Sequence, residues 1–416
     1  MNDNNINLLI IADSFPPAFA PRVGFLCKNL RKHKGWNVIV AAEQVEGTKH
    51  GIDIGDVKAH CHKFIKSNNK FLAKAEWTVK FVMTMAFDYK SLWFYRKIRK
   101  DVKGKKIDAV ICSTYSTFPL KSAQKIAIER RIPMIADLRD IAEQSDMSLY
   151  KSHKLPSIFG IDKWLYKRLD KLFIKRRNKI IRYADAVTSV SNWHVNFLKK
   201  HNENVHLIYN GYDSEMFKPK QIKNGSFDIV YTGRIGDIDF QSPDLFFKAV
   251  KQLMTDKKYN HILIKWYVDE KSKSLLEPEI KRYNLNNVND FMTTVNYSEI
   301  PNILAASSIC LVLTNKTGKN GPHGVMTTKF FEALGCERPV LCVRSDEGCL
   351  EEAINTTKAG IAARTVEEVV DFIKAKYEQW LAEGCTTQEI SQAEKEKFCR
   401  ERQAEQFAEL VESLRR

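Results

Sequence analysis

Residues 7–43 read NLLIIADSFPPAFAPRVGFLCKNLRKHKGWNVIVAAE, and this stretch decides the fold class. Two short apolar runs, at 7–13 and 37–43, enclose a segment at 25–34 that reads as a helix. An uninterrupted apolar run of this length is typical of a strand that is buried on both faces, as strands of parallel sheets are. The stretch therefore predicts two parallel strands joined by a helical crossover.

The same alternation continues along the rest of the chain. Further strand-like runs of the first half lie at 108–114, 133–138 and 184–191, with a helical segment at 122–131. After a segment with turn residues and a proline, the pattern restarts, with strands at 228–233, 261–268, 308–313 and 339–343 and helices at 243–254, 298–307 and 327–335. We therefore predict an α/β protein of two Rossmann-like, doubly wound domains, at 1–205 and 206–385, followed by a terminal helical segment at 386–416.

Size and composition agree with two packed domains. The chain has 416 residues, of which 44% are hydrophobic and 28% charged, which excludes wholesale disorder. Its nine cysteines contain no CxxC pair, so neither a disulfide framework nor a zinc site is indicated. The N-terminus lacks the basic start of a signal peptide, and no run of eighteen apolar residues occurs. We expect a cytoplasmic protein that does not span a membrane.

The net charge of +16 is concentrated in two segments. Residues 63–106 carry a surplus of ten positive charges and residues 151–182 a surplus of nine, so the rest of the chain is slightly acidic. The first segment also interleaves aromatic residues with its cations: Phe71, Trp77, Phe81, Phe87, Tyr89, Trp93, Phe94 and Tyr95. This composition suits an anionic membrane surface. A nucleic-acid groove uses the same residue types, and burial of the aromatics in a core is a third interpretation.

Several motifs, taken in order, resemble the family 4 retaining glycosyltransferases that build bacterial surface polysaccharides. They are the segments at 12–43, ADLRD at 136–140, ADAVTSVSNWHVNFLKK at 184–200, IYNGYDSEMFKP at 208–219, YTGRIGD at 231–237 and the segment at 323–343. The resemblance implies a GT-B fold, with two domains facing across a cleft and a C-terminal helix that returns to the first domain. It also implies a retaining, metal-independent sugar transfer that needs no cofactor, because the nucleotide-sugar is a substrate.

The segment TTKFFEALG, at 327–335, opens a helix directly after a strand and its loop. A helix N-terminus offers free N–H groups and partial positive charge to a diphosphate. Thr328 and Lys329 lie in the first turn, and the resemblance assigns Glu332 to the ribose hydroxyls of the donor. The structural alternative is a capping box formed by a threonine and a downstream acid.

YTGRIGD supplies a second donor element. Gly233 permits close backbone approach, and Arg234 can hold the diphosphate and stabilise the leaving group, with Lys329 as the second cation. Asp237 and Asp239 form a DxD pattern, which we interpret as a turn and not as a metal site.

The sequence departs from the family pattern at the sugar-contacting position. Many members carry a second glutamate eight positions before the first, where this chain has Gly324. The alternatives for that contact are His323, the backbone of Gly324 and Val325, or the N-terminal domain. Val295 completes the predicted donor-binding set.

In the N-terminal half, Arg22 and Gly24 lie in a segment that we expect to form a phosphate-binding or acceptor-binding loop, and the alternative for Arg22 is a solvated arginine in a proline-rich loop. ADLRD ends a strand, where open α/β sheets bind ligands, and Asp140 is the candidate to orient or deprotonate the acceptor hydroxyl. A structural lock between aspartate and arginine is the alternative for this element.

These features predict a glycosyltransferase that moves a sugar from a nucleotide-diphosphate donor to a saccharide acceptor, lipid-linked, at the inner face of the cell membrane, without nucleic acid as a partner. Two other classes stay open. A nucleotide-sugar epimerase of the same fold would keep the nucleotide site, and a non-catalytic polyanion-binding protein would explain the charge but not the ordered motifs.

Overall fold

The computed structural model describes residues 6–45, 54–55, 57, 59–144, 161–293, 295–314, 323–343 and 348–415. The chain forms two compact units, one of Met1–Tyr209 with Gln403–Arg416 and the other of Asn210–Arg402. The first ten residues of the second basic segment, 151–160, lie outside the described residues. No helix within the described residues combines the length and apolar composition that crossing a bilayer requires.

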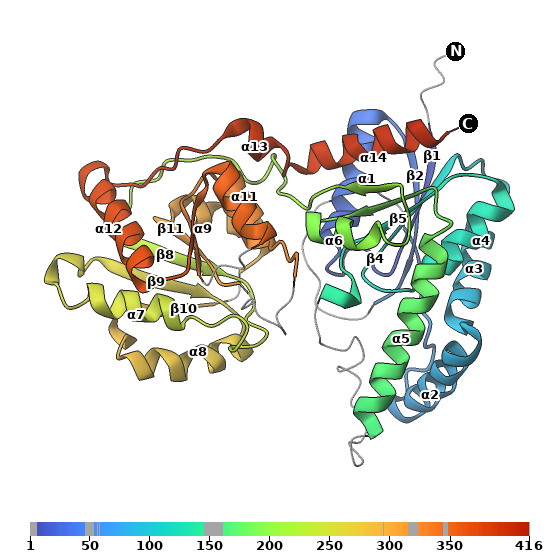
Figure 1. Ribbon diagram of the computed structural model, residues 1–416, viewed down its shortest axis with the longest axis horizontal. Helices are drawn as coiled ribbons and strands as arrows, with labels where there is room; N and C mark the ends of the chain where they lie inside the picture. Colours follow the sequence, from blue (N-terminus) through green and yellow to red (C-terminus); the bar gives the residue numbers. More distant parts are fainter. Residues whose placement is uncertain are drawn as a thin grey trace. The chain divides into compact units, whose positions relative to one another are not determined.

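The described part of the N-terminal unit contains a seven-stranded parallel sheet in the order β3-β2-β1-β4-β5-β6-β7 (Figure 1). Its strands are β1 (Asn7–Ala12), β2 (Asn37–Glu43), β3 (Ala59–His62), β4 (Ala109–Thr114), β5 (Met134–Leu138), β6 (Ala186–Ser189) and β7 (Val205–Leu207). In the register, Leu8 lies beside Val38 of β2 and Ala109 of β4. β1 is thus buried between two strands, as its apolar sequence predicts.

Helices cover both faces of this sheet. They are α1 (Pro21–Lys34), α2 (Lys70–Phe87), α3 (Tyr89–Asp101), α4 (Leu120–Arg130), α5 (Ile161–Ile181) and α6 (Asn192–Leu198). α1 has a proline at its start, where the missing N–H costs nothing, and ends at Gly35 in the left-handed conformation. α3 and α4 pack on one face through residues such as Phe94 and Ile126, and α1 packs on the other through Val23.

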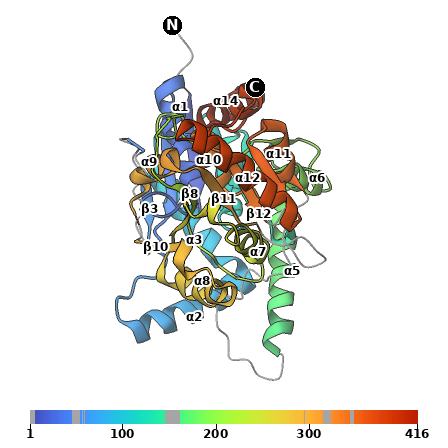
Figure 2. The ribbon, with the colours of Figure 1, turned by 90° about the vertical axis from the view of Figure 1, so that its left-hand side faces the viewer.

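The C-terminal helix α14 (Arg400–Leu414) belongs to the N-terminal unit from Gln403 onward. Phe407, Ala408 and Val411 are fully buried against the core formed by α1 and the sheet. Figures 1 and 2 show α14 alongside α1, with α2 at the opposite end of this unit. This return of the terminal helix confirms that part of the predicted fold class.

The described part of the C-terminal unit contains a six-stranded parallel sheet in the order β10-β9-β8-β11-β12-β13. Its strands are β8 (Phe227–Thr232), β9 (Ile262–Tyr267), β10 (Asn289–Met292), β11 (Ile309–Val312), β12 (Val340–Val343) and β13 (Gly360–Ala363). Its helices are α7 (Asp244–Leu253), α8 (Glu270–Tyr283), α9 (Ile300–Ala306), α10 (Thr328–Gly335), α11 (Cys349–Thr357), α12 (Val366–Glu383) and α13 (Gln392–Glu396). Buried aromatics, including Phe247 and Trp266, fill its core.

In both parallel sheets the order in which the strands are added reverses beside the first strand of the unit. In the N-terminal unit β2 and β4 flank β1, and in the C-terminal unit β9 and β11 flank β8. The loops after the two central strands therefore run to opposite faces, which leaves a crevice at the carboxyl ends where doubly wound proteins bind ligands. The two parallel sheets confirm the predicted Rossmann-like architecture.

The returning helix gives a stability prediction. We expect Phe407→Ala to lower the free energy of unfolding by about 3–5 kcal/mol, because it leaves a cavity in the N-terminal core. Glu412→Ala, at an exposed position of the same helix, should change it by less than about 0.5 kcal/mol. Urea unfolding of the full chain measures both. Equal unfolding midpoints for the two variants would contradict a core role for α14.

Candidate functional site

The crevice of the C-terminal unit brings Gly233 and Lys329 into contact. Gly233 follows β8 with a φ of +120°, a conformation that side chains rarely adopt. A Cβ on this glycine would lie 2.7 Å from Cε of Lys329, so a larger residue would displace the lysine. The sequence motifs at 231–237 and 327–335 therefore meet at one point of the structure, as their assignment to one donor site requires.

Lys329 is a cation held against an aromatic ring. Its Nζ lies 5.2 Å from the ring centroid of Tyr231, within the range of a cation–π interaction. Desolvation lowers the pKa of Lys329, while the carboxylate of Glu332 opposes that shift. A part-buried ammonium at the N-terminus of α10 is suited to an anionic ligand, because it has lost water contacts that a phosphate can replace.

Glu332 lies one turn further along α10. Desolvation raises the pKa of its carboxyl group to about 7, although the charges of Lys329 and Arg400 and a hydrogen bond from Tyr297 all act to lower it. Tyr297 comes from the turn before α9, and no motif in the sequence pointed to it. A carboxylate that the fold desolvates but leaves partly exposed can accept hydroxyl donors from a ligand.

The start of α10 has no side-chain cap from its N-cap residue. Thr327 is its N-cap residue and Thr328 its first helical residue, and Thr327 makes no side-chain capping hydrogen bond. The capping-box alternative for this motif is therefore not what the structure contains. The N-terminal turn of α10 retains donors that a diphosphate can accept from.

Arg234 extends from the same crevice. Its side chain is 65% exposed and forms an ion pair with Asp269, with 3.2 Å between Nε and Oδ2. Nearby, Asp237 accepts a hydrogen bond from the backbone N–H of Asp239 at 2.9 Å. This is an Asx turn, as we predicted for the DxD pattern. The described residues contain no group of three or more histidine, cysteine or acidic side chains arranged to hold a metal ion.

The remaining predicted donor residues lie on segments that lead into this region. Gly324 is buried and has a φ of +67°, so the backbone there turns in a way that favours glycine. His323 beside it is exposed, and Val295 follows β10 in a half-buried position. The assignment of these three residues to donor binding stays a prediction.

The N-terminal unit has its own polar cluster at the carboxyl ends of β1, β4 and β5. Asp13 follows β1 and is buried, and its carboxylate accepts hydrogen bonds from Arg139 at 2.5 Å and from Thr114 at 3.1 Å. The Nε of Arg139 is buried and has no hydrogen-bond partner among the described residues, and the ring of Tyr115 lies 5.9 Å from its guanidinium carbon. No sequence motif pointed to Asp13 or Tyr115, although both directly follow apolar strands.

Asp140 lies one residue beyond Arg139 on the same edge. Its carboxylate is solvent-exposed but has much protein around it, and this desolvation raises its pKa, whereas a hydrogen bond from Gln144 and the charge of Arg139 oppose the shift. An exposed carboxylate with a raised pKa at a strand end is suited to general base chemistry.

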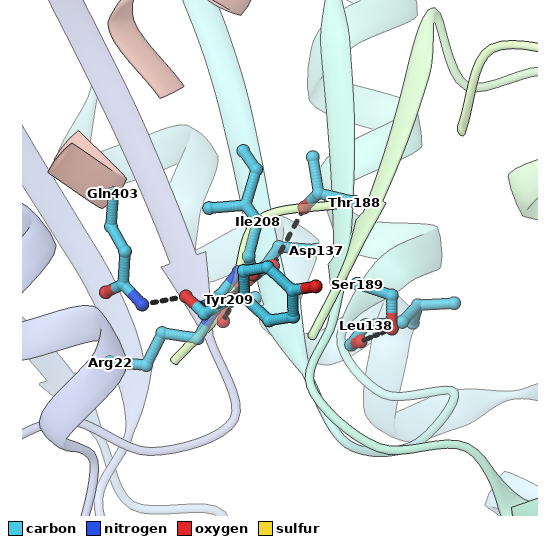
Figure 3. Close-up of polar contacts among 9 residues, drawn as sticks. Arg22, Asp137, Leu138, Thr188, Ser189, Ile208, Tyr209 and Gln403 are labelled. Carbon is cyan, nitrogen blue, oxygen red and sulfur yellow. Dashed lines mark hydrogen bonds and ion pairs between the residues drawn. The ribbon is translucent and has the colours of Figure 1, made fainter. Parts of the chain in front are cut away.

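Arg22 has a different place from the predicted one. α1 begins at Pro21, so Arg22 and Gly24 lie in a helix and not in a loop. The guanidinium is buried and binds Asp137 at 2.9–3.2 Å, and it also donates to the carbonyl groups of residues 208 and 209 (Figure 3). Gly24 packs tightly, because a Cβ there would lie 2.9 Å from Pro16. These contacts make Arg22 part of a buried structural lock, and it is neither a phosphate-binding loop residue nor a solvated arginine.

Asp137 completes the lock from the middle of the unit. Its carboxylate also accepts hydrogen bonds from Ser113 at 2.6 Å and from Thr188 at 2.8 Å. Burial by itself would raise the pKa of Asp137, but the charge and hydrogen bonds of Arg22 outweigh that effect and lower it. The carbonyl of Tyr209 accepts a further hydrogen bond from Gln403 (Figure 3), so this network ties the returning helix to the end of the N-terminal unit.

Comparison with protein families gives matches in both halves. Residues 23–216 match Glycosyltransferase Family 4, and residues 248–412 match a family described as glycosyl transferase-like. Both halves of the chain therefore match glycosyltransferase families, the first of them family 4. The sequence resemblance is thereby confirmed, and the family places a sugar-transfer activity on this fold. No curated protein matches the chain in sequence.

Solved structures of glycosyltransferases share the fold along the whole chain. Sucrose-phosphate synthase from Thermosynechococcus elongatus is 13% identical with a TM-score of 0.65, over 99% of each chain. HepE from Anabaena, in complex with UDP and glucose, is 14% identical with a TM-score of 0.65, over 99% of this chain and 100% of its own. The lipopolysaccharide outer core galactosyltransferase WaaB is 11% identical with a TM-score of 0.57, over 98% of this chain and 99% of its own. At such identities the likeness concerns the fold.

The raised pKa of Glu332 predicts a pH-dependent cost in stability. The folded-state pKa of about 7 lies above the ordinary value of 4.5, so the group stabilises the fold fully below pH 4.5, and this contribution is lost as the pH rises through 7. We expect Glu332→Gln to raise the free energy of unfolding by about 1–2 kcal/mol at pH 8 and to change it little at pH 5.

Urea unfolding of the full chain at the two pH values measures this difference. Glu389→Gln, at an exposed loop position of the same unit, is the control and should show no pH-dependent gain. A Glu332→Gln variant that is destabilised equally at both pH values would show that the carboxyl group is not desolvated.

Proposed function

We propose that this glycosyltransferase takes its sugar from a nucleotide-diphosphate donor bound in the crevice of the C-terminal unit. The observation that carries the proposal is the contact of Gly233 with Lys329 at the N-terminus of α10, with Glu332 one turn away. Lys329 and the helix N-terminus match the charge of a diphosphate, and Glu332 matches the two hydroxyls of a ribose. Val295, His323 and Gly324 complete the proposed donor site.

The sugar transfer is proposed to be retaining and to need neither a metal ion nor a cofactor. Arg234 and Lys329 supply the positive charge that stabilises the leaving diphosphate. Arg234 is suited to this role because its guanidinium is largely exposed and its ion pair with Asp269 is a surface pair of small energy. Asp140, in the N-terminal unit, orients or deprotonates the acceptor hydroxyl.

The proposed acceptor is a saccharide on a lipid carrier, in the synthesis of a cell-surface polysaccharide by a bacterium. The likeness to WaaB, whose name gives a lipopolysaccharide core as its context, supports this assignment at the level of the fold. The surface of the N-terminal unit supports it further, because one helix there has the properties of a membrane-binding element.

That helix is α2, which has no buried residue among those described. Its large exposed apolar residues are Phe71, Leu72, Val79, Val82, Met83 and Phe87, with exposed fractions from 37% to 79%. At about 100° per residue, the first five of these lie within an arc of roughly 120° that contains no charged side chain. Exposed apolar faces of this size on soluble domains mark interaction sites.

The charge around α2 favours anionic lipid as the partner. Lys66, Lys70 and Lys74 are exposed at its N-terminal end, within the segment that carries a surplus of ten positive charges. A helix with an apolar face and flanking lysines lies in the interface of an anionic membrane, with its apolar side chains at the acyl boundary. We propose that α2 attaches the enzyme to the cytoplasmic face of the cell membrane.

The structure corrects one expectation about this surface. Phe94 is fully buried in the core of the N-terminal unit, and Trp93 packs against that core. For these two aromatics the core interpretation was right, so they do not supply apolar contact with lipid. The exposed apolar residues come instead from α2.

The donor site is tested with UDP, GDP and ADP as probes. We expect one of them to raise the melting temperature of the full chain, and Glu332→Ala and Arg234→Ala each to weaken its binding roughly ten- to a hundredfold through loss of a charge-assisted hydrogen bond. Arg282→Ala is the matched control, because Arg282 is 63% exposed and paired with an acid of the same unit. Unchanged affinity in both site variants, measured by calorimetry, would remove the assignment.

The membrane surface is tested by sedimentation with vesicles. We expect the protein to sediment with phosphatidylcholine vesicles that contain phosphatidylglycerol, hardly with pure phosphatidylcholine, and to be partly released by high salt. Replacing Lys66, Lys70 and Lys74 with glutamine removes about 1 kcal/mol per charge and should weaken binding on the order of a hundredfold. Phe71→Ser with Val82→Ser should weaken the salt-resistant part.

The matched charge control replaces Lys257, Lys271 and Lys281, which are exposed on the C-terminal unit, with glutamine. This variant should bind vesicles as the wild type does. Equal binding of the wild type to neutral and anionic vesicles, or tight binding to duplex DNA without vesicle binding, would overturn the membrane proposal.

A further inference from the structure

Gln144 connects Asp140 to a buried histidine. It lies in the 3-10 turn Ala142–Gln144, directly after the ADLRD element. Its side-chain nitrogen donates to Oδ1 of Asp140 at 3.3 Å, and its side-chain oxygen lies 2.7 Å from Nε2 of His194. His194 in turn has its Nδ1 2.9 Å from the hydroxyl of Ser191. Four side chains from two segments of the N-terminal unit, 140–144 and 191–194, thus form one hydrogen-bonded chain.

The chemistry of these groups fixes the direction of every hydrogen bond. A carboxylate only accepts, so the amide nitrogen of Gln144 faces Asp140 and its oxygen faces His194. An amide oxygen only accepts, so the ring nitrogen that faces it at 2.7 Å, Nε2 of His194, carries the proton. Nδ1 is then an acceptor, and it takes the proton of the Ser191 hydroxyl. The chain therefore runs from Ser191 through His194 and Gln144 to Asp140.

The surroundings keep His194 in this form. Its side chain is fully buried, and desolvation lowers its pKa to about 4, with the carboxylate of Glu143 acting weakly in the other direction. Glu143 is itself neutralised by Arg177, whose two terminal nitrogens bind it at 2.6 and 2.8 Å. A neutral imidazole keeps one donor and one acceptor across the pH range in which enzymes work, so the hydrogen-bond directions stay fixed.

Local structure holds the members in place. Ser191 is the N-cap of α6 and accepts a hydrogen bond from the backbone N–H of His194, so the two residues share one capping turn. On the other side, Ile141 is buried in the core between Asp140 and Gln144 and anchors the 3-10 turn. The hydrogen bonds between Ser191 and His194 are buried, and a satisfied buried contact of this kind gives a rigidity that a surface carboxylate does not have by itself.

We propose that Gln144 and His194 are positioning residues that hold the carboxylate of Asp140 for the acceptor hydroxyl. The Gln144 amide occupies Oδ1 and leaves Oδ2 to accept the hydroxyl proton. The inference rests on the proposed acceptor role of Asp140. Three other charged groups act on that carboxylate, namely Arg139 and Arg22, which favour its ionised form, and Asp13, which opposes it.

A spectroscopic test detects the hydrogen bonds from Ser191 to Asp140 directly and needs no substrate. In protein labelled with ¹⁵N-histidine, we expect one imidazole to stay in the neutral Nε2–H form down to about pH 5 and to disappear from the spectrum of His194→Gln. Its Nε2 signal should shift with pH as Asp140 titrates. That pH-dependent shift should be absent in Asp140→Asn and in Gln144→Leu.

Ser189→Ala is the matched control. Ser189 is buried in the same unit and donates a hydrogen bond of 2.7 Å to the carbonyl of Leu138. Its replacement removes a buried hydrogen bond and leaves the hydrogen bonds from Ser191 to Asp140 in place. The control should lower the melting temperature and leave the His194 signal and its pH-dependent shift intact. A signal that ignores replacement of Asp140 and Gln144 would overturn the proposal.

A kinetic experiment distinguishes failure of this inference from failure of the proposed function. With UDP-glucose and water as the probe reaction, Gln144→Leu should lower UDP release on the order of ten- to a hundredfold without changing UDP affinity, because a misplaced carboxylate no longer orients the hydroxyl. Gln144→Leu in the Asp140→Asn background should add no further loss. Normal UDP release by Asp140→Asn would overturn the acceptor role itself, whereas normal release by Gln144→Leu alone would overturn only the positioning role.

Discussion

The reversal of strand order beside β1 and β8 is the constraint on which the rest of this structure depends. Parallel strands require crossovers, and where successive crossovers run to opposite faces, the carboxyl ends of two central strands are left uncovered. The polar residues of both units gather at these two edges. Gly233 follows β8 and Asp13 follows β1, although no sequence motif connects them. The order of the strands thus determines where in each unit a ligand can bind, whichever side chains lie there.

Within that scaffold the two crevices use buried charge differently. In the N-terminal unit Arg22 and Asp137 neutralise one another completely and are surrounded by further hydrogen bonds, an arrangement that fixes the structure. In the C-terminal unit Lys329 and Glu332 are desolvated and are paired less tightly. Burial therefore lowers the pKa of Lys329 and raises the pKa of Glu332, which favours the neutral form of each. Groups that the fold leaves electrostatically unsatisfied are the ones a charged, hydroxyl-rich ligand can satisfy, and such sites are commonly held at the expense of stability.

The N-terminal unit has a hydrogen-bonded network in its interior and an exposed apolar helix face on its surface. Arg22 donates hydrogen bonds to the carbonyl groups of residues 208 and 209, and Gln403 of the returning helix donates to the carbonyl of residue 209 as well. The two chain segments that lead to the other unit are therefore held together at residue 209. At the opposite end of the same unit, α2 presents an apolar face that no part of the described chain covers. These properties are consistent with an enzyme that keeps its sheet edge ordered while one helix meets an external surface.

The sequence by itself determined the two parallel sheets, their order along the chain and the helix start at 327–335 as a candidate anion site. Those features follow from local patterns, because runs of apolar residues define buried strands and a helix start defines an anion site. Only the tertiary structure decided which charges pair. Arg22 looks like a loop cation in the sequence, but it lies in α1 and is paired with a residue 115 positions away. Likewise Phe94 and Phe71 belong to one aromatic, basic segment, yet one is in the core and the other is exposed. Burial and long-range pairing depend on what packs opposite a side chain, and the neighbouring residues in the sequence do not contain that information.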